Sequence, residues 1–265
     1  MPPAMAKVVA LYRYPVKGFT PEPAERITVL PGGRVAGDRV LNFRFADAPV
    51  GDTEWCRKYH GVVLANTPGL ARIAARFDER AERLALHADG RVLAEHALDD
   101  AGRKALVAAI TDYVLSLDES PLRGQPGRLP LKLVGDGVSP RYQDNQAGQV
   151  TLHSRESLAS AGAALGDAHL NERRFRHNIV IEGVAAWEEL GWVGRGVRVG
   201  NVTFETMVPK VRCLATHANP VTGERDRAVM QTLVKAFGQE QPTFGVGMLS
   251  AAGGEVRVGD TLSTL

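Results

Sequence analysis

The chain is poor in cysteine and contains no long apolar run. Cys56 and Cys213 are the two cysteines among 265 residues, and neither belongs to a CxxC pair. Two separated thiols cannot supply the four ligands of an iron–sulfur cluster, and they favour a reducing compartment over a disulfide framework. No window approaches the roughly 18 apolar residues that a membrane-spanning helix needs. We therefore predict no membrane association and no cluster of the chain's own.

An excess of one charge is also missing. The 32 basic and 30 acidic residues give a net charge of +2 and form no long runs, so nucleic acid is not indicated as a partner. The segment 1–7 lacks the apolar core of a signal peptide, and we predict a soluble cytoplasmic protein. The proline- and glycine-rich segment 121–130 is the predicted boundary between domains at 1–120 and 121–265.

Short apolar or β-branched segments separated by turn residues dominate the chain. Strands are predicted at residues 7–12, 40–45, 179–181, 197–199 and 202–206. Asp89-Gly90 and Gly200-Asn201 each lie between two such segments, which predicts hairpins. Many short strands with few helices favour a β-barrel, so the predicted fold class is mostly β with a few helices (α+β).

Helices are predicted where apolar residues recur with helical spacing behind a capping residue. Leu106, Ile110 and Val114 recur every four residues, which buries one face of a helix. Ser154 can cap a second helix, because its hydroxyl can accept a hydrogen bond from a free backbone amide. A third helix is predicted at 225–237.

The segment around Cys213 is the predicted centre of the chemistry. A thiolate is the reactive form of cysteine, and the adjacent Arg212 favours that form. The predicted strand 202–206 precedes the cysteine and a turn at Asn219-Pro220 follows it, so we expect the thiol near a strand end. A soft thiolate there can bind a soft metal that a cofactor already holds. The alternative is a small buried hydrophobic side chain.

Two basic positions in the first half of the chain are candidates for binding a phosphate. Lys17 offers an ammonium group beside Gly18, where a ligand can approach the backbone closely. Arg39 can direct two parallel N–H groups at phosphate oxygens. The alternatives are a solvated surface lysine at Lys17, and an Asp38 that simply pairs with a nearby cation.

The second half of the chain offers further anion-binding groups. Ser154 and Ser157 lie at a predicted helix start, where free amides attract anions, although they can also serve as caps alone. Alternation along an extended strand would point Arg174, Arg176 and Asn178 to one face, toward a phosphate or a pterin edge. Solvent-exposed arginines are the alternative.

Several of these residues fall in segments that resemble the MOSC domain family. The segments are Arg174–Gly183, Val211–Cys213 with Thr216, Asn219–Gly223 and Val256–Asp260. Tyr12–Gly18, followed by Gly37–Arg39, resembles the β-rich domain that commonly precedes MOSC. The resemblance covers nearly the whole chain and implies a MOSC-type β-barrel behind a smaller β-rich N-terminal domain.

The MOSC family includes the C-terminal domain of molybdenum cofactor sulfurase and reductases of amidoximes and hydroxylamines. The resemblance implies that Cys213 is catalytic and binds molybdenum. It implies that the molybdenum cofactor is held by Lys17, Gly18, Arg39, Ser154, Ser157, Arg174, Arg176, Asn178, Arg212 and Thr216. It further implies reduction of a small N-hydroxylated substrate with electrons from an external ferredoxin-, flavin- or cytochrome-type protein. A carrier of cofactor or sulfur without turnover is the alternative, and a degenerate member without metal is a third hypothesis.

The chain departs from the family pattern at four positions. Gly18 stands where the reductases usually have serine, and His177 where they have proline. Lys210 replaces a cysteine that does not bind metal, and Asn219 replaces an aspartate. The Asn219 change removes a carboxylate near the metal. His217 is then the candidate for proton delivery, since imidazole titrates near neutral pH.

Overall fold

The described residues, 6–265, form many short strands and three α-helices. The helices are α1 (Asp100–Ser116), α2 (Arg155–Ala164) and α3 (Val229–Phe237). The strands are β1 (Lys7–Arg13), β2 (Glu22–Ala24), β3 (Arg26–Val29), β4 (Asn42–Arg44), β5 (Ile73–Asp78), β6 (Arg83–Ala88), β7 (Arg91–Ala97), β8 (Lys132–Val134), β9 (Val150–Ser154), β10 (Ile179–Glu182), β11 (Gly196–Val199), β12 (Val202–Val211), β13 (Thr243–Leu249), β14 (Gly254–Arg257) and β15 (Leu262–Thr264). The prediction of a mostly β chain with a few helices (α+β) is confirmed.

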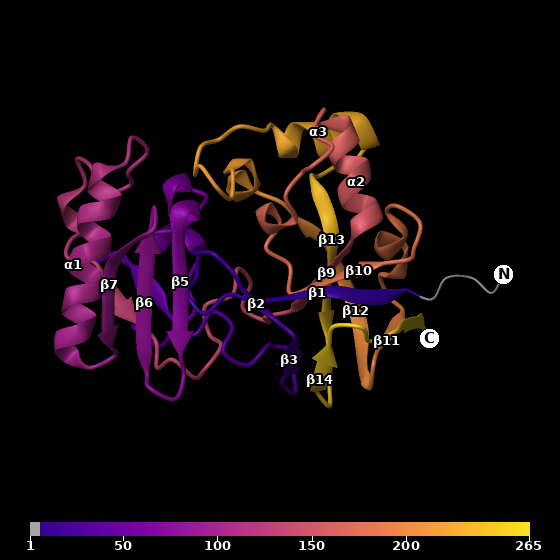
Figure 1. Cartoon of the computed structure of the whole chain (residues 1–265), viewed down its shortest axis with the longest axis horizontal. Helices are drawn as coiled ribbons and strands as arrows, with labels where there is room; N and C mark the ends of the chain where they lie inside the picture. Colours follow the sequence, from indigo (N-terminus) through magenta and orange to yellow (C-terminus); the bar gives the residue numbers. More distant parts are fainter. Residues whose placement is uncertain (1–5) are drawn as a thin grey trace.

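The computed structural model in Figure 1 has two lobes that lie side by side. The larger lobe is built on an eight-stranded sheet in the order β15-β11-β12-β13-β9-β10-β1-β2. β9 and β10 pair in parallel, whereas β1 and β10 pair antiparallel. β3, from the start of the chain, pairs with β14 from its end. β1 and β2 therefore extend the eight-stranded sheet that the second half of the chain builds, while β3 and β14 form a separate two-stranded sheet.

Alternating burial explains why these segments form strands. Along the β11–β12 hairpin, Val197, Val199, Val202 and Phe204 are buried while the residues between them are exposed or half-buried. A period of two residues places one apolar face of a strand on the core. Val199 pairs with Val202 across Gly200-Asn201, so the predicted hairpin is confirmed.

The smaller lobe packs α1 against the three-stranded sheet β5-β6-β7 (Figure 1). Leu106, Ile110 and Val114 of α1 are fully buried in that contact, as their spacing predicts. Asp99 caps the helix by accepting a hydrogen bond from the Gly102 amide at 2.7 Å. β6 and β7 form the predicted hairpin around Asp89-Gly90.

α2 and α3 lie together over one end of the larger sheet (Figure 1). α2 follows Ser154, whose hydroxyl accepts a hydrogen bond from the Ser157 amide at 3.1 Å, so the predicted cap is confirmed. α3 begins at Val229, four positions after the predicted start. The prediction was wrong there because Arg225 is fixed by Glu119 and by two backbone carbonyls, which holds its segment outside the helix.

The fold does not test the predicted absence of a signal peptide or the predicted division into two domains. Residues 1–5, part of the segment from which a signal peptide was judged absent, lie outside the described residues. Across residues 6–265 there is no helix with the length and apolar character needed to cross a membrane. The division into domains at 1–120 and 121–265 stays a prediction.

Candidate functional site

Cys213 lines a cavity of about 700 Å³ between segments from both halves of the chain. One wall comes from Lys17-Gly18, Arg39, Lys58 and the segment 63–65. The other comes from segments 143–145, 175–177 and 208–213, together with Gln149, Thr151 and Ala215. The cysteine lies two residues beyond the end of β12, as the prediction of a strand-end thiol requires.

The cavity is strongly positive. Six of its side chains are basic and one is a carboxylate: the bases are Lys17, Arg39, Lys58, Arg176, Lys210 and Arg212, and the acid is Asp144. Like charges in a confined space raise each other's energy, and burial adds to that cost. An anion with more than one negative charge would relieve both.

Two of these arginines stack on the ring of one buried tyrosine, Tyr14. The guanidinium carbons of Arg39 and Arg176 lie 4.9 Å and 4.3 Å from the centre of the Tyr14 ring. Burial, together with the nearby Arg39, lowers the pKa of Arg176 to about 10. Both arginines have positive φ angles, 54° and 57°, which costs a residue with a side chain about 1 kcal/mol or more. Backbone strain of this kind clusters at functional sites, and two cations held close together would attract an anion.

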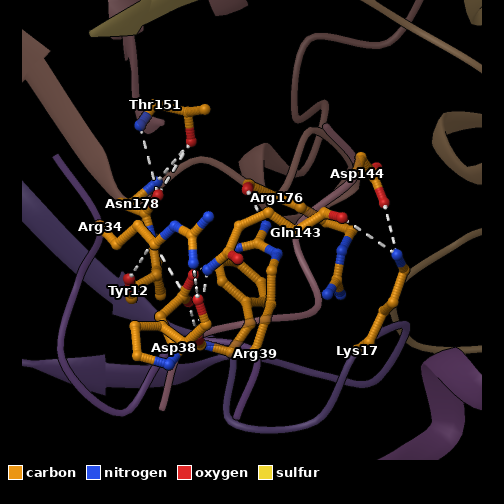
Figure 2. Close-up of polar contacts among 12 residues, drawn as sticks. Tyr12, Lys17, Arg34, Asp38, Arg39, Gln143, Asp144, Thr151, Arg176 and Asn178 are labelled. Carbon is orange, nitrogen blue, oxygen red and sulfur yellow. Dashed lines mark hydrogen bonds and ion pairs between the residues drawn. The ribbon is translucent and has the colours of Figure 1, made fainter. Parts of the chain in front are cut away.

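Asp38 and Asn178 hold Arg39 in place (Figure 2). Asp38 pairs with the Arg39 guanidinium and accepts a hydrogen bond from the Tyr14 amide at 2.8 Å. Asn178 is fully buried and binds Tyr12 and Thr151 on the neighbouring strands. Asn178 was predicted to bind the cofactor, but its amide is used inside the protein and does not line the cavity. Asn178 also donates to the Asp38 carboxylate at 3.4 Å, and Asp38 in turn pairs with Arg39, which does line the cavity.

Lys17 lines the cavity beside Asp144. Its ammonium lies 3.7 Å from the Asp144 carboxylate and donates to the Gln143 carbonyl at 3.2 Å (Figure 2). Burial lowers the pKa of Lys17. Desolvation favours the neutral form of Asp144. Attraction to the positive charges of Lys17, Lys58 and Arg39 is stronger, so the pKa of Asp144 is lowered. The carboxylate stays charged and keeps the lysine in the cavity.

The backbone conformation at position 18 explains why this chain has glycine where the reductases usually have serine. Its φ is +84°, and an added Cβ would lie 2.7 Å from the Cα of Val63. Serine cannot adopt this position without moving the neighbouring backbone. The backbone of this chain therefore lies closer to Val63 than a side chain at position 18 would permit.

Cys213 is half-buried and is flanked by two bases. Its carbonyl accepts hydrogen bonds from the Thr216 amide at 3.0 Å and the Thr216 hydroxyl at 2.9 Å, which closes the turn after the thiol. Arg212 donates to the Phe175 carbonyl and to Nε2 of His177 at 3.2 Å. Burial works against the charge of Lys58, but attraction to Cys213 and Asp144 prevails and raises the pKa of Lys58. The Thr216 side chain, predicted to bind the cofactor, is occupied in the turn.

His177, a departure from the family pattern, forms a buried pair with His153. Their Nδ1 atoms lie 2.8 Å apart. Because arginine only donates, Nε2 of His177 must accept from Arg212, and His177 then donates through Nδ1 to His153. His153 consequently carries its proton on Nε2, and this buried atom has no hydrogen-bond partner within residues 6–265. Burial lowers the pKa of both rings, that of His153 to about 3, so both are neutral.

The start of α2 binds an anion, but the anion is the protein's own Glu189. Ser154 and Ser157 donate their hydroxyls to Glu189 Oε2 at 3.2 Å and 2.8 Å, and the Ser154 amide points at Oε1. All three side chains are buried, and burial raises the pKa of Glu189. The helix start attracts a carboxylate as helix geometry predicts, and neither serine lines the cavity.

The expected strand through residues 174–178 is not formed. Arg174 ends a short 3-10 helix, and the left-handed Arg176 breaks the alternation before β10 begins at Ile179. Arg174 therefore points away from the cavity, where it pairs with Asp226 at 2.7 Å and binds the backbone of 216–218. The prediction of one shared face was wrong, because helical and left-handed backbone replaced the extended one.

His217 does not face the cavity either. Its Nε2 accepts a hydrogen bond from the Met230 amide at 3.3 Å, and burial lowers its pKa. Asn219 donates a hydrogen bond to the Asp226 carboxylate at 2.7 Å, so a carboxylate does lie close to this loop. Asp226 accepts hydrogen bonds from both Arg174 and Asn219. Within residues 6–265, the hydrogen bonds of the His217 side chain do not reach a residue that lines the cavity.

Sequence reasoning missed several of the residues that line the cavity. Lys58 and Asp144 lie in segments without helical or strand periodicity, and the neighbouring residues form no motif that would indicate a binding role for them. Lys210 and His177 were noticed solely as departures from a pattern. Within residues 6–265, no group of three or more His, Cys, Asp or Glu side chains could hold a metal ion by itself.

Two family models match the chain. One, the MOSC N-terminal beta barrel domain, matches residues 5–114, and the other, the MOSC domain, matches residues 139–263. This chain is a MOSC-domain protein. Its cavity is shared between the two matched regions, because Lys17, Arg39 and Lys58 belong to the first and Arg176 and Cys213 to the second.

Two curated relatives match part of the chain in sequence. The MOSC-domain protein is 30% identical over 121 residues to mitochondrial amidoxime reducing component 2 of Bos taurus, covering 42% of this chain and 35% of the relative. The Rattus norvegicus protein of that name is 34% identical over 96 residues, covering 32% and 28%. The match spans about a third of each relative's length. A solved structure, the YUAD protein of Bacillus subtilis, covers 98% of this chain and 95% of its own with 10% identity and a TM-score of 0.44.

Proposed function

We propose that this protein binds the molybdenum cofactor in its cavity and reduces N-hydroxylated substrates with electrons from an external donor. The observation that supports it is a single thiol, Cys213, in a cavity with six basic side chains and one carboxylate. The names of the two mammalian relatives include amidoxime reduction, which is one N-oxygenated class. Because the match spans about a third of those proteins, the activity is our proposal for this chain.

The residues present fit the cofactor on two grounds. The cofactor's phosphate is a dianion, and Lys17, Arg39 and Arg176 form the cluster that would hold it. A lone soft thiolate suits a metal whose other ligands come with the cofactor, so Cys213 would be the protein's ligand. Buried polar atoms of the cavity residues Gln143 and Arg212 also lack partners within residues 6–265, which leaves them available to a ligand.

The reaction takes two electrons and two protons and converts N–OH to N–H and water. When bound, the molybdenum cofactor supplies the two-electron chemistry. The protein's own residues would bind the cofactor, and their six basic side chains keep the cavity positive. The chain has no cluster-binding cysteine set, so the electrons come from a separate ferredoxin-, flavin- or cytochrome-type protein. We place the protein in the cytoplasm.

Turnover distinguishes this reductase from a carrier of cofactor or sulfur. We expect protein loaded with molybdenum to reduce benzamidoxime to benzamidine steadily with reduced methyl viologen as the artificial donor. Cys213→Ser should lose at least about 100-fold in kcat, because removing a group on which the reacting centre depends costs several kcal/mol. Cys56→Ser, which changes the other cysteine, should retain activity. Full metal loading with no turnover of benzamidoxime or hydroxylamine would instead support the carrier.

A further inference from the structure

The six bases of the cavity fall into two groups. Four are held by acceptors of the protein: Lys17 by Asp144 and Gln143, Arg39 by Asp38, Arg176 by the Phe19 carbonyl and Arg212 by Phe175 and His177. Lys58 and Lys210 differ. Within residues 6–265 neither forms an ion pair with a carboxylate, and each has one weak partner: the Lys58 ammonium lies 5.6 Å from the centre of the Tyr59 ring, and Lys210 donates one hydrogen bond, to the neutral side-chain amide of Gln149 at 3.0 Å.

Lys58 and Lys210 come from opposite walls of the cavity. Lys210 belongs to β12, three residues before Cys213. Lys58 belongs to the first half of the chain, in a short 3-10 helix at Lys58–His60, and Cys213 is the leading group among those that attract its charge. The two ammonium groups therefore enter the cavity that Cys213 lines from two separate segments.

The loop that carries Lys58 is fixed. Arg44, which is buried, donates to the carbonyls of Gly51 and Glu54 at 2.7 Å and 2.8 Å. Trp55 donates its indole N–H to the Gln143 carbonyl at 2.9 Å, which ties the loop to the far wall. An ammonium on so firmly held a loop is preorganised for a partner.

Apolar side chains lie beside these lysines at the cavity. Val208 and Val211 both line it, and their exposed fractions of 40% and 54% are high for valine. They flank Lys210 on β12. An apolar wall next to two ammonium groups that have no carboxylate of residues 6–265 within ion-pair distance suits a ligand with an apolar body and a negative end.

We propose that the substrates of this protein are apolar N-hydroxylated compounds that carry a carboxylate, and that Lys58 and Lys210 bind this carboxylate. This inference rests on the proposed function. The bases held by the protein's own acceptors serve the cofactor. The two remaining lysines recognise the substrate's anionic end, while the valines contact its apolar body. Lys58 and Lys210 are thus specificity-determining residues.

The test compares two substrates that differ by one carboxylate. We measure kcat/KM for benzamidoxime and for 4-carboxybenzamidoxime with the loaded protein. The wild type should prefer the carboxylated compound by roughly tenfold or more, because hydrogen bonds to charged groups are stronger than those between neutral groups. Lys58→Met and Lys210→Met should each reduce the ratio, and the double variant should bring it to about one. Lys58→Arg should keep the preference, and Lys235→Met on the exposed face of α3 is the matched control.

Binding and metal content separate this inference from the proposed function. Calorimetry with the unreactive amides 4-carbamoylbenzoate and benzamide, on the protein as purified, should show tighter binding of the carboxylate that the double variant loses. Molybdenum content is measured on the same samples. An unchanged substrate ratio and unchanged binding in the double variant would overturn the inference. Variants whose molybdenum content falls while the ratio of the remaining activity stays at the wild-type value would also overturn it. A wild type without metal would refute the proposed function, while the calorimetry would still decide the role of the lysines.

Discussion

At the scale of single residues, the cavity depends on backbone positions that favour glycine or tolerate strain. Gly18 has a positive φ and lies against Val63, and Arg39 and Arg176 have positive φ angles although they carry long side chains. Strain of this kind persists where surrounding contacts fix the backbone. Here the contacts are Asp38, Tyr14 and the backbone carbonyls that the guanidinium groups bind.

Gly18→Ser, which restores the residue usual in the reductases, should destabilise this chain. We expect a loss of about 2–3 kcal/mol in the free energy of unfolding, because left-handed backbone and a 2.7 Å approach to Val63 act together. Gly32 has a similar φ of +88° with nothing within 4 Å, so Gly32→Ser is the matched control and should cost about 1 kcal/mol. Denaturant unfolding measures both. Equal losses would show that the contact with Val63 has no effect.

The buried His153–His177 pair should make stability depend on pH. Burial holds both folded pKa values below the ordinary 6.5, so the unfolded state binds more protons as the pH falls below 6.5. Stability is therefore full above pH 6.5 and declines toward pH 5, by up to about 1.4 kcal/mol per pH unit for each ring. His153→Phe, which fits the aromatic contacts with Phe175 and Phe244, should lower this slope in thermal unfolding. Parallel curves for the two proteins would refute the assignment.

At the scale of elements, the loop after Cys213 is held from behind by one buried ion pair. Arg174 is 3% exposed, and it binds Asp226 and three successive carbonyls of the loop. Removing one partner leaves the other charge buried without compensation. The pair fixes the loop that carries the thiol, although neither side chain reaches the cavity.

Asp226→Asn should therefore cost about 3 kcal/mol of unfolding free energy, as expected for one partner of a buried pair. Asp167, which pairs with the more exposed Arg227, gives the comparison: Asp167→Asn should cost less than about 1 kcal/mol. Thermal and urea unfolding of the two variants measure the difference. A loss of the same size at both positions would mean that the loop does not depend on Arg174.

The elements that could be predicted from the sequence are those with strong periodicity. The helix with Leu106, Ile110 and Val114 and the hairpin at Gly200-Asn201 follow from residues close together in the chain. The segment 174–178 has no such pattern, and the left-handed turn at Arg176 has no local signal. Glu189 lies 32 residues beyond Ser157, so its occupation of the α2 start depends on tertiary structure.

At the scale of the whole molecule, the cavity exists because the two halves of the chain meet. Loops from the first half bring Lys17, Arg39 and Lys58 against the second half's Arg176 and Cys213. The family resemblance pointed to four of these five residues, whereas Lys58 required the structure. Residues far apart in the sequence build the site together, and no window of the sequence contains it.

The measurement that tests the central claim most directly is molybdenum content. The wild type, Cys213→Ser and Cys56→Ser are purified from a host that makes the cofactor, and metal is determined by elemental analysis. The account predicts near-stoichiometric molybdenum in the wild type and in Cys56→Ser, and little or none in Cys213→Ser. Absence of molybdenum from all three, under conditions that load a known molybdoenzyme, would contradict the account and leave a MOSC-domain protein without the metal.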